Sequence, residues 1–168
     1  LLRNLGKLQE AELSTRKAIK INSTYAKAHN NLGGILKDQG NLEDAEIFLR
    51  KAIELNPKDE IAHSNLGSIL IDLGKLQEAE LSTRKAIDIN PDFADAHSNL
   101  GNILRDLGKL QEAELSQRKA IELNPDFANA HYNLGTILRD LGKLQEAELS
   151  LRKAIELKPH FAEAHLNL

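Results

Sequence analysis

Residues 128–161 read ANAHYNLGTILRDLGKLQEAELSLRKAIELKPHF, and close copies of this stretch recur along the chain every 34 residues. Four glycines keep this step: Gly33, Gly67, Gly101 and Gly135. Five further glycines keep it as well, namely Gly6, Gly40, Gly74, Gly108 and Gly142, and so do all four prolines, Pro57, Pro91, Pro125 and Pro159. A fixed step of this size is typical of solenoids, propellers and other repeat arrays.

The composition excludes several classes of protein. Charged residues make up 28% of the 168 residues and hydrophobic ones 41%, which is ordinary for a folded chain. There is no Cys, so disulfides, thiolate nucleophiles and Cys-bound zinc are excluded. The net charge of −3 argues against nucleic acid as a partner, and no apolar run approaches the ~20 residues of a membrane span. We expect a cytoplasmic protein, and the absence of Met suggests a fragment or a processed product.

Each repeat is predicted to be a pair of helices. The first helix is indicated by apolar residues spaced four, three and four apart: Ala130, Leu134, Ile137 and Leu141. Gly142 suits a left-handed helix stop, a second amphipathic run follows over residues 144–157, and Pro159 ends it. Gly135 lies inside the first helix, where Gly costs about 1 kcal/mol relative to Ala, so its recurrence predicts a close helix–helix approach.

Charged residues are assigned to caps and to an outer face. Asp92 and Asp126 follow prolines and are predicted to cap the next helix. In the second helix of each repeat, a Glu precedes an Arg by four residues: Glu12–Arg16, Glu46–Arg50, Glu80–Arg84, Glu114–Arg118 and Glu148–Arg152. This is the favourable orientation for a helix pair, and we interpret the pairs as a solvated face.

The chain resembles the tetratricopeptide repeat (TPR) family over its whole length. The resemblance rests on the 34-residue step, the Leu-Gly pair of the first helix and the terminal Pro. It also rests on two Ala ladders in the second helix: Ala11, Ala45, Ala79, Ala113, Ala147 and Ala18, Ala52, Ala86, Ala120, Ala154. Where the family usually has a Trp or Tyr in the first helix, this chain has His29, His63, His97, His131 and His165. Where it usually has a large aromatic in the second helix, this chain has Thr15, Leu49, Thr83, Gln117 and Leu151.

The resemblance implies an all-α fold, a right-handed superhelical solenoid of antiparallel helix-turn-helix units whose first helices line a concave groove. We predict a single solenoid over 1–168, with full units 26–59, 60–93, 94–127 and 128–161 and partial units 1–25 and 162–168. In the first of these partial units, residues 1–5 would be the end of a first helix. Family members bind peptides or protein surfaces in the groove and generally catalyse nothing.

One polar ladder is predicted to bind the partner. It consists of Asn31, Asn65, Asn99, Asn133 and Asn167. A carboxamide donates and accepts, so it can pair with a peptide backbone whatever the side chains. Stacked helices lie ~10 Å apart and an extended peptide advances ~3.3 Å per residue, so one Asn would meet every third ligand residue. The ladder resembles the groove of the TPR region of O-GlcNAc transferases and related bacterial arrays. Alternatively, these Asn side chains bridge neighbouring helices.

Further groove candidates lie on the same helix face: Asn30, Asn102, Tyr132, Lys37, Arg105 and Arg139. The three cations are each followed by an aspartate, which should offset their charge, at Asp38, Asp106 and Asp140. A clamp for a C-terminal carboxylate is therefore not favoured.

No enzyme, metal site or cofactor is predicted. Zinc ligands lie ~2 Å from the metal, whereas equivalent histidines on stacked repeats would be ~10 Å apart. The sequence has no nucleophile elbow, phosphate loop or His–Glu metalloprotease motif. Catalytic residues are therefore assigned nowhere.

The sequence favours a non-catalytic scaffold that binds an extended peptide or protein segment in the groove, with neither nucleic acid nor membrane as partner. A second hypothesis is the substrate-recognition arm of a larger enzyme such as a glycosyltransferase. A third is head-to-tail self-association through ends without polar caps, because GKLQEAELS occurs unchanged at 6–14, 74–82, 108–116 and 142–150.

Overall fold

The computed structural model describes the backbone of residues 2–168 and the side chains from residue 6 onwards. The described residues form ten helices and no strand, so the predicted all-α fold is confirmed. The chain divides into two compact units, Leu1–Ile89 and Asn90–Leu168. That these units continue into one superhelical solenoid stays a prediction.

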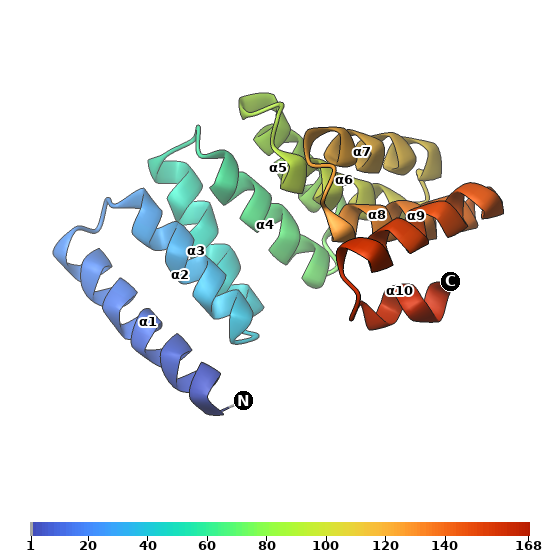
Figure 1. Ribbon diagram of the computed structural model, residues 1–168. Coiled ribbons are helices and arrows are strands. Elements are labelled where there is room, and N and C mark those ends of the chain that lie inside the picture. The colour runs from blue at the N-terminus through green and yellow to red at the C-terminus, as the bar shows by residue number, and fades with distance from the viewer. Residues whose placement is uncertain (1) are drawn as a thin grey trace. The chain divides into compact units, whose positions relative to one another are not determined.

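The helices alternate between two kinds. The first helices are α2 (Ala26–Asp38) and α4 (Glu60–Asp72) in one unit, and α6 (Ala94–Asp106), α8 (Ala128–Asp140) and α10 (Ala162–Asn167) in the other. The second helices are α1 (Leu2–Ile21), α3 (Leu42–Leu55) and α5 (Leu76–Ile89), then α7 (Leu110–Leu123) and α9 (Leu144–Leu157). Within each unit every helix packs against the next one along the chain, most extensively inside the hairpins α2–α3, α4–α5, α6–α7 and α8–α9 (Figure 1). The first helices also contact one another, α2 with α4 and α6 with α8.

The stop predicted at Gly142 is found, and it recurs at the equivalent glycine of the other three full units. Gly40, Gly74, Gly108 and Gly142 have φ of 82°, 72°, 75° and 75°. This left-handed conformation is readily adopted only by glycine, and it turns the chain between the two helices of a hairpin. Gly6 lies inside α1, and its predicted stop is wrong. A turn at Gly6 would set only five residues against the second helix, too few to form a stable helix. The side chains of residues 1–5, the predicted end of a first helix, lie outside the described residues.

The predicted caps are also wrong. The residues directly before α6 and α8 are Phe93 and Phe127, and neither makes a side-chain cap hydrogen bond. Asp92 instead donates its backbone N–H to the side chain of Asn90 at 3.1 Å, so it belongs to a turn closed by an asparagine. The cap aspartate occurs one position later, only in the α4 repeat. There Asp59 accepts from the backbone N–H groups of Ile61 and Ala62, both at 3.1 Å.

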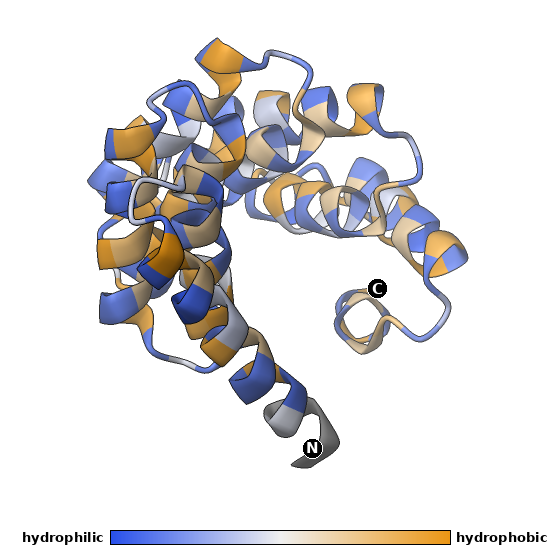
Figure 2. Cartoon of the chain, turned by 90° about the vertical axis from the view of Figure 1, so that its left-hand side faces the viewer, coloured by the Kyte–Doolittle hydropathy of each residue, from blue (hydrophilic) through white to orange (hydrophobic). Residues whose placement is uncertain are grey.

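The core lies between the helices of each hairpin. Hydrophobic and hydrophilic residues are interspersed along the coloured helices (Figure 2). The closest approach is at the recurring glycine, as predicted. A Cβ on Gly33 would lie 2.6 Å from Leu49 Cγ, and one on Gly135 would lie 2.7 Å from Leu151 Cγ. Equivalent Cβ atoms on Gly67 and Gly101 would meet Thr83 and Gln117. Each glycine therefore provides the space that a second-helix side chain fills.

The five recurring histidines hold the loops before the first helices. The Nε2 of each lies within hydrogen-bond distance of the backbone carbonyl six residues earlier, at 2.9 Å for His29–Ser23, 3.1 Å for His63–Pro57, 2.8 Å for His97–Pro91, and 2.9 Å for both His131–Pro125 and His165–Pro159. Because a carbonyl only accepts, Nε2 carries the proton in each contact. The sequence indicated a packing role for these side chains but not this link between helix and loop.

All five predicted Glu–Arg pairs form, but two of them are more than a solvated face. Glu46 pairs with Arg50 at 2.7 Å and also with Lys75 at 2.7 Å, while Arg50 reaches Glu78 at 2.6 Å. The same group of four recurs in the second unit, at Glu114, Arg118, Lys143 and Glu146. The side chains of Glu46 and Glu114 are only 12% and 11% exposed. Within each unit, the network joins one hairpin to the next.

The first prediction compares two adjacent glycines of α2. Gly33→Ala should lower the free energy of unfolding by about 1–3 kcal/mol, because its Cβ would overlap Leu49 and lie 3.3 Å from the carbonyl oxygen of Ala45. Gly34→Ala should raise it by up to about 1 kcal/mol, because nothing lies within 4 Å of its Cβ and Ala favours the helix. Urea unfolding followed by circular dichroism measures both. Equal effects of the two substitutions would contradict the close approach.

The second prediction concerns acid. The hydrogen bond from Lys75, together with Arg50, lowers the pKa of the Glu46 carboxyl, and Lys143 with Arg118 lowers the pKa of Glu114. A lowered pKa means that the stabilisation is fully present above the unfolded pKa of about 4.3 and is lost as pH falls through the folded value.

The melting temperature should therefore be flat above about pH 5 and fall below about pH 4. The double substitution Glu46→Gln, Glu114→Gln should lower it at neutral pH, and its curve should meet that of the parent in acid. Parallel curves at every pH would show that the ion networks contribute nothing. Thermal melts across the pH range measure this.

Candidate functional site

The predicted site residues lie on the first helices of both units, and the surface of those helices that carries them is here called the first-helix face. Asn31 lies on α2, Asn65 on α4, Asn99 on α6, Asn133 on α8 and Asn167 on α10. Asn31 is exposed, and the other four are half-buried. Asn30, Asn102, Tyr132, Lys37, Arg105 and Arg139 lie on the same helices.

The Asn ladder bridges neighbouring first helices. Asn65 Nδ2 donates to Asn30 Oδ1 at 2.9 Å, which links α4 to α2. Asn133 Nδ2 donates to Ser98 Oγ at 3.5 Å, which links α8 to α6. In both cases the acceptor lies 35 residues earlier. Each contact engages one amide hydrogen, and a carboxamide has a second hydrogen and an oxygen that accepts two bonds. A bridging role and a binding role are therefore compatible.

The last ladder residue lies at a cluster of three predicted site residues. Asn167 Nδ2 donates to the Tyr132 hydroxyl at 3.2 Å, and its Oδ1 accepts from Arg139 at 2.6 Å. Tyr132 is held from the other side by the ring of Phe161, with ring centroids 4.8 Å apart. This cluster fixes an aromatic ring and a guanidinium between α8 and α10.

The other two cations of the face pair across repeats. Lys37 donates to Ser68 and lies 3.4 Å from Asp72, both on the next first helix. The sequence predicted that the adjacent Asp38 would offset Lys37. The partner is instead Asp72, 35 residues later, because the side chain of Lys37 runs towards the neighbouring helix.

Arg105 pairs both with the adjacent Asp106 at 3.7 Å and with Asp140 of the next first helix at 4.0 Å. It also donates to Thr136 Oγ1 at 3.2 Å. The charges of Lys37 and Arg105 are therefore each offset by an aspartate of the next first helix.

A buried side chain, Gln117, contacts the first-helix face from the interior of the hairpin. The sequence did not suggest it as a site residue. It is fully buried on α7, and its Nε2 donates to the backbone carbonyl of Ser98 at 2.8 Å and to Asn102 Oδ1 at 3.1 Å. Asn102 accepts through its oxygen, so its NH₂ group is available to the face. The Oε1 of Gln117 is buried without a hydrogen-bond partner. The signal in the sequence was a polar residue where other hairpins carry Leu49 and Leu151.

The described residues hold no group of three or more His, Asp or Glu side chains arranged to bind a metal ion. No helix among them is long and apolar enough to cross a membrane.

Comparison with known families identifies the repeat. Models described as tetratricopeptide repeat match residues 26–59 and 128–161, and another with the same description matches residues 48–80. A model described as TPR repeat matches residues 67–104 and 101–138. The chain belongs to the TPR family. The resemblance to the TPR region of O-GlcNAc transferases in particular stays a prediction.

Solved TPR structures resemble the whole chain. A crystal structure of MamA is 27% identical with a TM-score of 0.80, and the match covers 96% of this chain and 94% of MamA. YrrB, described as a TPR protein with an unusual peptide-binding site, is 25% identical with a TM-score of 0.75, covering 99% of this chain and 86% of YrrB. A thermophilic TPR protein of Thermus thermophilus is 23% identical with a TM-score of 0.82, covering 98% and 90%, and supports the fold alone. No curated protein matches the sequence.

The third prediction tests the buried glutamine of this TPR chain. Gln117→Leu should leave stability unchanged or raise it, because the substitution removes an unpartnered buried oxygen and restores the Gly–Leu contact of two other hairpins. At the same time Asn102 loses its tether, so its side-chain amide should become more mobile. Thermal melting and side-chain amide NMR report the two effects separately. A large loss of stability would contradict this account of the glutamine.

Proposed function

We propose that this TPR chain is a non-catalytic scaffold that binds an extended segment of a partner protein along the first-helix face. The observation that carries the proposal is the Asn ladder, one carboxamide on each first helix. Asn65 engages one amide hydrogen with Asn30, and its amide has further hydrogen-bonding capacity. Asn31 is exposed. A peptide backbone offers the alternating N–H and C=O groups that such amides can pair with.

The charge of the face favours a backbone ligand over a charged one. Lys37 is offset by Asp72, and Arg105 by Asp106 and Asp140. Arg139 is engaged with the neutral side chain of Asn167. A cluster of cations without partners would be expected for a phosphate or a terminal carboxylate. The balanced pairs instead leave neutral amides and hydroxyls as the recurring groups of the face.

The similarity to YrrB adds support. That protein is described as a TPR protein with an unusual peptide-binding site, and the similarity extends over 86% of its chain.

The fourth prediction separates binding from bridging. The triple substitution Asn65→Ala, Asn99→Ala, Asn133→Ala should abolish binding of the peptides that a peptide array selects with the intact chain. It should keep the helical circular dichroism spectrum and cost about 1 kcal/mol of stability per lost bridging bond. Fluorescence anisotropy with the selected peptides and urea unfolding measure the two effects.

A matched control is Asn41→Ala, because Asn41 precedes α3, is exposed and makes no side-chain cap bond. It should change neither binding nor stability appreciably. If the triple variant binds the selected peptides as the parent does, the ladder has only its bridging role and the proposal fails.

A further inference from the structure

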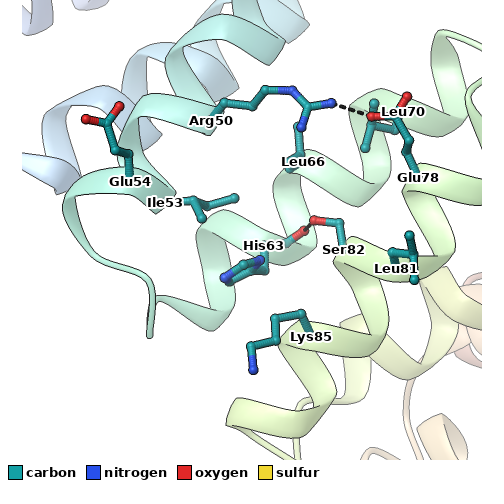
Figure 3. Close-up of a pocket in the computed structure, with 10 residues that line it drawn as sticks. All are labelled: Arg50, Ile53, Glu54, His63, Leu66, Leu70, Glu78, Leu81, Ser82 and Lys85. Atoms are coloured by element: carbon teal, nitrogen blue, oxygen red, sulfur yellow. Dashed lines mark hydrogen bonds and ion pairs between the residues drawn. The ribbon is translucent and has the colours of Figure 1, made fainter.

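An open pocket of about 520 Å³ lies away from the Asn ladder, among α3, α4 and α5. Its lining includes Ile53, His63, Leu66, Leu81 and Lys85. Figure 3 shows the ion pair between Arg50 and Glu78 at one end, Lys85 at the other, and the apolar side chains between them. The pocket thus combines an apolar middle with charged ends.

The same pocket recurs in the second unit, with a volume of about 440 Å³, at positions 68 residues later. Ile121, His131, Leu134, Leu149 and Lys153 take the places of the five residues above. Two independent copies show that the pocket follows from the repeat itself and not from a local irregularity.

An exposed apolar side chain forms one wall of each pocket. Leu81 is 72% exposed and Leu149 is 68% exposed. The equivalent residues of the other second helices are exposed as well: Leu13, Ile47 and Leu115. Ile47 and Leu115 lie on α3 and α7, which pack against helices on both sides within their own units, so an absent repeat does not explain their exposure. These residues recur every 34 positions, yet the fold does not bury them.

A lysine follows each of these apolar residues by four positions: Lys17, Lys51, Lys85, Lys119 and Lys153. Three of them are neutralised by a glutamate three residues on, each at 2.7 Å: Lys51–Glu54, Lys119–Glu122 and Lys153–Glu156. Lys85 is followed at that distance by the shorter Asp88, and within the described part of the chain it makes no ion pair. The other charges lining its pocket are already paired, because Arg50 holds Glu78 and Lys51 holds Glu54. The unneutralised charge of this pocket is therefore positive.

We propose that the pocket walled by Leu81 and Lys85 is a second docking site, which takes an apolar side chain flanked by carboxylates from an acidic segment of a partner protein. The apolar side chain would enter beside Leu81, and a carboxylate would pair with Lys85. In an extended segment with an apolar residue at every third position and acidic residues between, each apolar side chain is flanked by carboxylates, so the segment can present such a group to this pocket in more than one register.

The test uses the whole chain and a fluorescent synthetic peptide in which Leu recurs at every third position and Glu fills the others. Binding is measured by anisotropy, and the contacted residues by NMR of the leucine methyl groups. The Leu81 methyl signals should shift. Leu81→Ser and Lys85→Glu should each weaken binding about tenfold or more. Both residues are exposed, so neither substitution should affect folding.

Asp88→Glu is the sharpest control, because it keeps the net charge and should give Lys85 the partner that the other lysines have. It should weaken binding of the acidic peptide. A peptide with Lys in place of Glu, and one with Ser in place of Leu, should bind at least tenfold less well. The triple Asn variant of the ladder should bind the acidic peptide as the parent does, which separates this site from the first-helix face.

Three outcomes would overturn the proposal. The first is no binding of the acidic peptide, and the second is binding that Leu81→Ser and Lys85→Glu leave unchanged. The third is binding to vesicles of anionic phospholipid that exceeds binding to the peptide, since it would identify a membrane surface as the occupant.

Discussion

The close approach of two helices at one glycine per hairpin is the constraint on which the rest of the structure depends. A Cβ at Gly33 or Gly135 would overlap the side chain that fills the space, so the two helices could not lie as close as they do. This approach, together with the left-handed glycine of the turn, fixes how the second helix returns along the first. Once the two helices of a hairpin are fixed in this way, the contacts to the next repeat depend on which side chains occupy the positions that face it.

Contacts between repeats therefore occur at constant separations. Ladder amides reach 35 residues back, to Asn30 or Ser98, and guanidinium groups of the second helices reach 28 residues forward, as Arg50 does to Glu78. Because both partners recur every 34 residues, one favourable pair is repeated in each unit. In a chain with few aromatic residues, such polar contacts, some with nearly buried carboxylates as at Glu46 and Glu114, join hairpins together with apolar packing such as that of Ile121 against Leu134 and Leu138.

The sequence predicted the period, the helix pairs and the close approach at the recurring glycine, because each of these follows from a residue pattern that repeats along the chain. It misassigned Gly6 and the caps Asp92 and Asp126, because a turn and a cap depend on where the neighbouring helix begins and on what it packs against. It also missed the partners of Lys37 and Arg105, and the link from Gln117 to Asn102, since those contacts join residues 15 to 35 apart whose side-chain directions no periodicity reveals. Bridging of neighbouring helices by the Asn side chains was the alternative that the sequence left open, but their partners Asn30 and Ser98 were not predicted.

The first and second helices differ in which of their recurring residues have a structural role. On the second helices, the stretch GKLQEAELS is identical in four repeats, and most of it has a structural reason. In the copy at 74–82, Gly74 forms the turn, Ala79 is buried in the core, and Lys75 and Glu78 pair with the preceding repeat. Leu81 has no such reason, because a 72% exposed leucine contributes little to folding.

On the first helices, most exposed positions vary between repeats, whereas the ladder asparagine recurs in each of them. The asparagine does have a structural role, since Asn65 and Asn133 bridge neighbouring first helices, but each bridging contact uses only part of the amide's hydrogen-bonding capacity. The recurring groups without an internal partner are therefore the rest of the amide on one face and an apolar group beside a lysine on the other. These chemistries differ enough that the two faces would select different segments.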